Sequence, residues 1–179
     1  MSLDTVLLRD EYDDNRAAGA VNGTTATDSI NAREVTDTGN RMSISASSLN
    51  SLADGPSLDP KLFYGSSINR VAGLVLCAKI RSTTLKFDVF GWYADKTGSN
   101  PRGDIYLYGG SWRSSSEGLL WGTWNTNTNY VIYNVLRSTG TFSLVATAGG
   151  YPLLGWISSV YNTSPLYVGI RSANPGNAY

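Results

Sequence analysis

The chain has 179 residues, a length that suits one domain spanning residues 1–179 with a sizeable core. Lys plus Arg and Asp plus Glu number 14 each, so the formal net charge is zero; this balance argues against nucleic acid or an anionic membrane as a partner and permits self-association. The chain contains no histidine, which excludes Ser–His and Cys–His nucleophile pairs and histidine metal sites.

The beginning of the chain, MSLDTVLLRDEYDD, has a short apolar run followed by charges. This pattern predicts no export signal, and no later run is long enough for a membrane-spanning helix. Residues 9–20 are predicted to form a strand followed by a turn, and residues 23–39 a long polar surface excursion. The acidic cluster is predicted to be a solvated edge without a buried partner; its members are Asp10, Glu11, Asp13 and Asp14.

From residue 41 the side chains alternate between apolar and polar, as in half-buried strands. Residues 41–46 are the first such strand, and residues 53–67 are predicted to be an irregular connection. Residues 73–81 carry apolar side chains at both even and odd positions, which face opposite sides of a sheet, and this predicts a central strand covered on both sides. Cys77, the one cysteine, lies in this run and is expected to be a buried small hydrophobe; no disulfide can form within the chain.

Two aromatic-rich runs, residues 86–94 and 104–110, flank a polar loop at residues 95–104. We predict that their rings cover both faces of a central strand pair. The loop contains three oxygen-bearing side chains that could bind calcium, namely Asp95, Asn100 and Asp104. It also contains the cell-attachment tripeptide Arg-Gly-Asp at residues 102–104, at the expected hairpin tip. Ordinary turn chemistry is the alternative explanation for both features.

The second half of the chain continues the alternation at residues 129–137, 140–147 and 164–172. The sequence LRSTGTF, residues 136–142, predicts a hairpin because two apolar runs flank a short turn that contains glycine. No stretch shows apolar residues at helical spacing. Strands at regular intervals without helices between them predict an all-β, antiparallel sandwich.

The stretch GLLWGTWNTNTNY combines indole rings with amides, as sugar-binding surfaces do, because rings stack on apolar sugar faces and amides bind hydroxyls. The same rings suit core packing or a protein interface equally well. The candidate glycan-binding residues are Trp112, Trp121, Trp124, Asn125, Asn127 and Tyr130.

Several phrases follow one another in a familiar order, namely RMSIS, LFYGSSINRVAGLVLCAKI, YVIYNVLRSTGTFSLVATAGG and SPLYVGIRSAN. In this order the chain resembles the concanavalin A-like lectin/glucanase (laminin G-like) modules, variants of which occur in bacteriophage and bacterial surface proteins. The resemblance implies an antiparallel two-sheet jelly-roll sandwich. It also implies one more strand after Tyr179, so the last sheet position is expected to be filled by a neighbouring subunit or by a longer form of the chain.

Glucanases of this superfamily carry a Glu-x-Asp-x-x-Glu strand, which this chain does not match, so we expect no enzymatic activity. The expected function is that of a structural or interaction protein of a virus particle, in a phage tail, fibre or capsid decoration. Such a protein reaches the virion or the extracellular space by lysis, without a signal peptide. The expected partners are copies of itself or other virion proteins, with no cofactor apart from calcium as a candidate. The alternative is a glycan-binding adhesion module that recognises a surface glycan.

Overall fold

The computed structural model describes residues 6–28, 30–51, 60–81, 87–98, 101–108, 110–114, 120–147, 150, 152–158 and 165–173. Within these ranges the secondary structure consists of strands and turns, without a helix, and the strand pairs are antiparallel. The strands are β1 Arg33–Thr36, β2 Met42–Ser45, β3 Ser48–Ser51, β4 Lys61–Tyr64, β5 Val75–Ile80, β6 Phe87–Tyr93, β7 Pro101–Tyr108, β8 Ser111–Arg113, β9 Leu120–Thr123, β10 Tyr130–Leu136, β11 Thr141–Thr147, β12 Pro152–Ser158 and β13 Tyr167–Ala173. The prediction of an all-β, antiparallel protein is confirmed.

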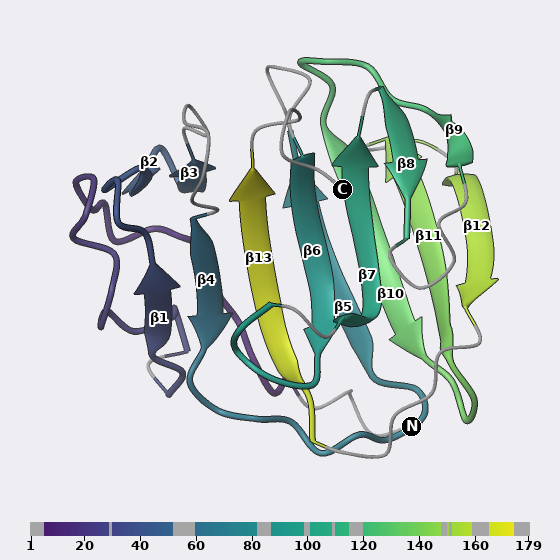
Figure 1. Cartoon of the computed structure of the whole chain (residues 1–179), viewed down its shortest axis with the longest axis horizontal. Coiled ribbons are helices and arrows are strands. Elements are labelled where there is room, and N and C mark those ends of the chain that lie inside the picture. The colour runs from purple at the N-terminus through teal and green to yellow at the C-terminus, as the bar shows by residue number, and fades with distance from the viewer. Residues whose placement is uncertain are drawn as a thin grey trace.

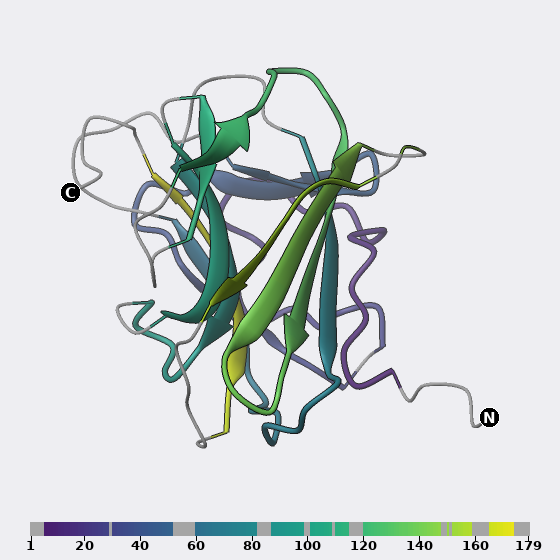
Figure 2. The same ribbon diagram turned by 90° about the vertical axis from the view of Figure 1, so that its right-hand side faces the viewer.

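The strands form two main layers. A seven-stranded sheet has the order β1-β4-β13-β6-β7-β8-β9, and a four-stranded sheet has the order β12-β11-β10-β5. Figure 1 shows the seven-stranded sheet in front, and Figure 2 shows it to the left of the four-stranded sheet. A small hairpin of β2 and β3 lies near the end of the molecule where β1 and β4 are found.

The hairpin of β10 and β11 follows directly from its sequence. The burial of β10 alternates strictly, with Tyr130, Ile132 and Leu136 in the core cluster. The pairing begins at Leu136 opposite Thr141. In the turn, the N–H of Arg137 donates to the carbonyl of Gly140 (3.0 Å), and Gly140 has a φ of 76°, a conformation that glycine adopts without a steric penalty. The predicted hairpin is confirmed.

The rings of β6 are divided between the two faces of the seven-stranded sheet, as predicted. Phe90 and Trp92 point into the core between the layers. Tyr93 points to the outer face, where its ring meets that of Phe63 edge to face at 5.2 Å and Tyr167 packs beside them. The loop after β6, seen in front of β13 in Figure 1, lies over this outer face.

The N-terminal segment supplies the part of the second layer that the four-stranded sheet does not reach. In Figures 1 and 2 the purple segment lies on the same side of the seven-stranded sheet as the four-stranded sheet. Val21 and Ala26 belong to the core cluster, and Leu8 and Tyr12 pack against it. The inner side chains of β1 and β4 are therefore covered by irregular backbone.

The strand predicted within residues 9–20 does not form: this segment is irregular, with one isolated bridge between Arg16 and Ile44. Three further predictions about segments were wrong. The predicted surface excursion at residues 23–39 contains β1, in which Arg33 is fully buried. The predicted irregular connection at 53–67 contains β4, of which Leu62 lies in the core. The loop predicted at 95–104 ends earlier, because β7 begins at Pro101. β1 and β4 are short strands added to a sheet whose other members are distant in sequence, and local alternation does not show this. β7 instead pairs with β6, the strand directly before it, so here only the position of the boundary was wrong. No helix in the described part of the chain is long and apolar enough to cross a membrane.

Candidate functional site

The structure describes two of the three predicted calcium ligands, Asp95 and Asp104. The Asp95 carboxylate accepts hydrogen bonds from the N–H (2.8 Å) and the hydroxyl of Thr97, so it closes its own turn. Asp104 lies in β7 with 1% of its surface exposed, and Asn100 lies outside the described residues. No group of three or more acidic or Cys side chains suited to a metal was found among the described residues. Calcium binding stays a prediction.

The tripeptide at residues 102–104 was expected at an exposed hairpin tip. It lies within β7, where both Gly103 and Asp104 are buried. An integrin-type ligand must display its carboxylate to solvent, so this expectation was wrong.

Most of the predicted glycan-binding rings lie in the core. Trp112, Trp124 and Tyr130 are 0%, 4% and 3% exposed, and the rings of Trp112 and Tyr130 meet edge to face at 5.1 Å. Asn125 and Asn127 are exposed, and the N–H of Asn125 donates to the Tyr130 hydroxyl (2.8 Å). Trp121 lies in β9, and its side chain is outside the described part of the structure. The structure thus brings together part of the predicted group, with the amides accessible and the described rings used for packing.

The acidic cluster at the chain start was predicted to lack a buried partner, and this was wrong. Arg33 on β1 is 0% exposed, and its guanidinium forms a two-point ion pair with Asp10, with Nε–Oδ2 and Nη2–Oδ1 distances of 2.7 and 2.6 Å. Its Nη1 donates to Asp14 Oδ2 (2.8 Å) and to the hydroxyl of Thr24 (3.0 Å). Sequence alone shows an arginine and some aspartates, but not that the chain folds back over 23 residues to pair them.

Two tyrosines complete this network. The Tyr64 hydroxyl donates to Asp10 Oδ2 (2.9 Å) and lies 2.8 Å from the Tyr12 hydroxyl. The Arg33 guanidinium lies 5.5 Å from the centre of the Tyr12 ring. Burial raises the pKa of both tyrosines above the ordinary value, whereas the hydrogen bond from Arg33 lowers the pKa of Asp14 to about 2. Because the charges satisfy one another, the network acts as a clamp that holds the N-terminal segment on β1 and β4.

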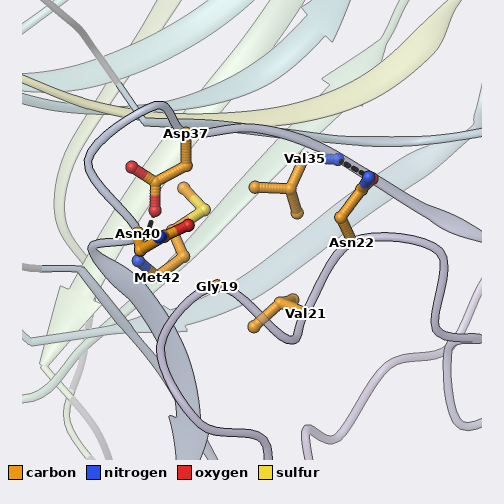
Figure 3. A pocket seen from close by; sticks show the side chains of 7 residues that line it. All are labelled: Gly19, Val21, Asn22, Val35, Asp37, Asn40 and Met42. Atoms are coloured by element: carbon orange, nitrogen blue, oxygen red, sulfur yellow. Dashed lines mark hydrogen bonds between the residues drawn. The ribbon is translucent and has the colours of Figure 1, made fainter.

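A small hollow lies between the N-terminal segment and the turn after β1 (Figure 3). Its volume is about 160 Å³, and it is lined by Gly19, Val21, Asn22, Val35, Asp37, Asn40 and Met42. The polar groups that line it already serve the fold. Asn22 accepts a hydrogen bond from the N–H of Val35 (2.9 Å), and Asp37 accepts one from the N–H of Met42 (2.7 Å). Ligand pockets are usually about 300–1,000 Å³, so the hollow is a gap between loops.

The outer face of the four-stranded sheet carries a row of apolar side chains. The side chains of β10 and β11 that alternate with the core residues point away from the seven-stranded sheet. Among the described side chains, this outer face consists of Val75, Cys77 and Lys79 on β5, Val131, Tyr133 and Val135 on β10, and Phe142 and Leu144 on β11; Ala146, opposite Val131, is buried. All of these are apolar except Lys79.

Two large apolar side chains on this face are exposed, with Val75 at 54% and Tyr133 at 38%. Cys77 is also exposed, so the expectation of a buried thiol was wrong. The prediction that β5 is a central strand covered on both sides was wrong too: it lies at the end of its sheet and only its inner side chains are covered. The apolar residues on both sides of the strand were correctly identified, but the outer ones, Val75 and Cys77, are exposed and not covered by a second layer of the described chain.

The free side of β5 also carries backbone hydrogen-bonding groups. Leu136 donates its N–H to the carbonyl of Leu74 (2.8 Å), and in an antiparallel pair residues alternate between facing the partner and facing away. Val75, Cys77 and Lys79 therefore direct their N–H and C=O groups away from β10. No other described strand pairs with β5, so this is an open edge of the kind that can accept another strand.

Comparison of the chain with protein-family models, curated proteins and solved structures found no match.

Proposed function

We propose that this chain is a non-catalytic building block of a virus particle, a tail, fibre or capsid-decoration component with a concanavalin A-like jelly-roll fold. In this proposal it assembles through sheet edges and apolar sheet surfaces. The observation that carries the proposal is the outer face of the four-stranded sheet, where Val75 and Tyr133 expose apolar surface around Cys77. Contiguous apolar patches on soluble domains commonly mark sites of protein association.

The opposite outer face supports this assignment by contrast. On the seven-stranded sheet, the loop after β6 is fastened by charged groups, with Lys96 bound to Glu34 at 2.7 Å and Arg171 donating to the carbonyl of Gly98 (3.0 Å). There the chain itself lies over part of the face, with Lys61 also donating to the carbonyl of Thr97 (2.9 Å). The face of the four-stranded sheet has no such cover in the described residues, and it is left for a partner.

The absence of catalysis is part of the proposal, and the clamp supports it. The clamp brings two acidic residues, Asp10 and Asp14, to one guanidinium, and Arg33 bonds both. A glycosidase needs one carboxylate free to attack or activate water while another donates a proton. Carboxylates bound by a buried guanidinium are poorly suited to either role.

Immunogold labelling of purified particles from the producing culture tests the proposal, with antibodies raised against the recombinant chain. We expect gold on the particle surface, and labelling abolished by competition with the free chain. If purified particles are unlabelled while the chain is abundant in the same lysate, the chain is not a virion component.

A second function, glycan binding, is favoured by one observation. Asn125 and Asn127 are exposed, and Arg81 lies 3.5 Å from the amide oxygen of Asn127. Exposed amides and a guanidinium suit sugar hydroxyls. A glycan array probed with monomeric protein distinguishes the two functions, because a lectin binds specific sugars as a monomer and a scaffold does not.

A further inference from the structure

We propose that the partner on the outer face of the four-stranded sheet is a second copy of this chain, packed face to face with its own four-stranded sheet. This inference rests on the proposed function, because it names the partner for the surface on which that function depends. It is supported by the layout of the face, the position of its charge and its size.

The face has a regular layout that the strand register defines. One row runs across the sheet from Val75 through Val135 to Phe142, and the next runs from Cys77 through Tyr133 to Leu144. Adjacent strands lie about 4.8 Å apart, and two sheets pack face to face at about 10 Å with their side chains interdigitated. A second sheet with the same small and large apolar side chains provides a matching surface.

The charge on this face favours a copy over a charged partner. Lys79 is the one charged residue that faces outward from β5, β10 and β11, and it lies at a corner, on the edge strand and near its end. A two-fold axis running along or across the strands places the two Lys79 side chains on different corners. The two side chains are then separated either by four residues along a strand or by three strand spacings across the sheet, which is about 13 Å in both cases. This separation exceeds the Debye length of about 8 Å in physiological salt, so the repulsion between the two charges is largely screened.

The whole chain imposes no opposing repulsion, because its formal net charge is zero. A highly charged partner, such as a nucleic acid or an acidic peptide, would find no complementary charge on this apolar face. The second copy is therefore the partner that the surface chemistry fits best.

The size of the face sets the expected strength. The three strands that carry the described face, about 20 Å long and 4.8 Å apart, cover about 300 Å² per partner, less than half the 800 Å² per partner of a standard stable interface. We therefore expect a weak dimer in free solution, which strengthens only when further contacts hold copies together.

Cys77 provides a direct reporter, since it is the one cysteine of the chain, it is exposed, and it lies in the same row as Tyr133. The test measures the mass of the purified full chain by sedimentation equilibrium from about 10 µM to about 1 mM. At each concentration, the rate at which Cys77 reacts with a disulfide reagent such as DTNB is measured as well. Partial burial raises the pKa of this thiol, so all rates are compared at one pH.

We expect the average mass to rise from 19.3 kDa toward twice that value as the concentration increases, with Cys77 protected in proportion to the dimer. Tyr133→Lys should weaken association by about tenfold, as expected for an aromatic residue near the centre of an interface. Ile30→Lys is the matched control, because Ile30 is an 80% exposed apolar residue elsewhere; it should leave association unchanged. Circular dichroism and the Tm confirm that both variants are folded.

Two outcomes overturn the inference. If the mass stays monomeric throughout the concentration range, there is no self-contact on this face. If dimers form while Cys77 reacts at the same rate at all concentrations, the copies meet elsewhere, and the proposed assembly function survives. Immunogold labelling tests the proposed function separately, since that function fails if the antibodies do not label the particles.

Discussion

The buried pair of Arg33 and Asp10 gives the sharpest prediction about stability. Asp10→Ala removes both bonds of the two-point ion pair, at 2.7 and 2.6 Å, and the acceptor of the Tyr64 hydroxyl at 2.9 Å. The side chains of Arg33 and Asp10 are 0% and 3% exposed, so water cannot replace the lost partner. Breaking a buried ion pair from one side costs about 3–5 kcal/mol.

Asp14 still contacts Arg33 through Nη1 (2.8 Å) and compensates part of the buried charge, so we expect a loss of about 3–4 kcal/mol in the free energy of unfolding. For a chain of this size each kcal/mol corresponds to about 2–4 °C, so the Tm should fall by roughly 6–16 °C. Urea unfolding monitored by tryptophan fluorescence and by circular dichroism measures the change.

The matched control is Glu11→Ala. Glu11 pairs with Arg9 nearby, and the side chains of Arg9 and Glu11 are 58% and 53% exposed. An exposed pair contributes about 0–1 kcal/mol, so this variant should unfold almost like the parent. The double variant Arg33→Met with Asp10→Leu should recover part of the loss, since it leaves no buried charge unpaired. A loss below about 1 kcal/mol for Asp10→Ala would refute the conclusion that this clamp holds the N-terminal segment.

Three further predictions follow from the same geometry. The hydrogen bond from Arg33 lowers the pKa of Asp14 to about 2. The stabilisation that ionised Asp14 provides is therefore present above the ordinary carboxyl pKa of about 4 and is lost as the pH falls toward 2. Asp14→Asn should make the Tm fall less steeply between pH 5 and pH 2, and an unchanged slope would contradict this. Burial raises the pKa of Tyr12 and Tyr64, so stability should fall as the pH rises above about 10, and ultraviolet titration should show both phenols ionising later than exposed tyrosines. Gly91→Ala should lower the free energy of unfolding by about 1–3 kcal/mol, because a Cβ there would lie 2.5 Å from backbone atoms of β7; a variant as stable as the parent in urea would show that β7 moves freely.

The local pattern of the chain determined several of its strands. Alternation at residues 130–136 and 141–147, with a turn ending in Gly140, indicates a hairpin without further information, and β10 and β11 form it with Leu136 opposite Thr141. The division of the β6 rings between two faces followed in the same way, since successive side chains in a strand point to opposite sides. These features depend on neighbours in sequence, which the sequence shows directly.

What covers each face was decided by the tertiary structure. Residues 73–81 are apolar at both parities, and their sequence cannot distinguish a strand between two layers from an edge strand that exposes Val75. Likewise, Asp10 looks like a solvated charge until the chain places it on Arg33. Burial and ion pairing depend on which segments lie opposite one another in space, and such contacts join residues far apart in the chain.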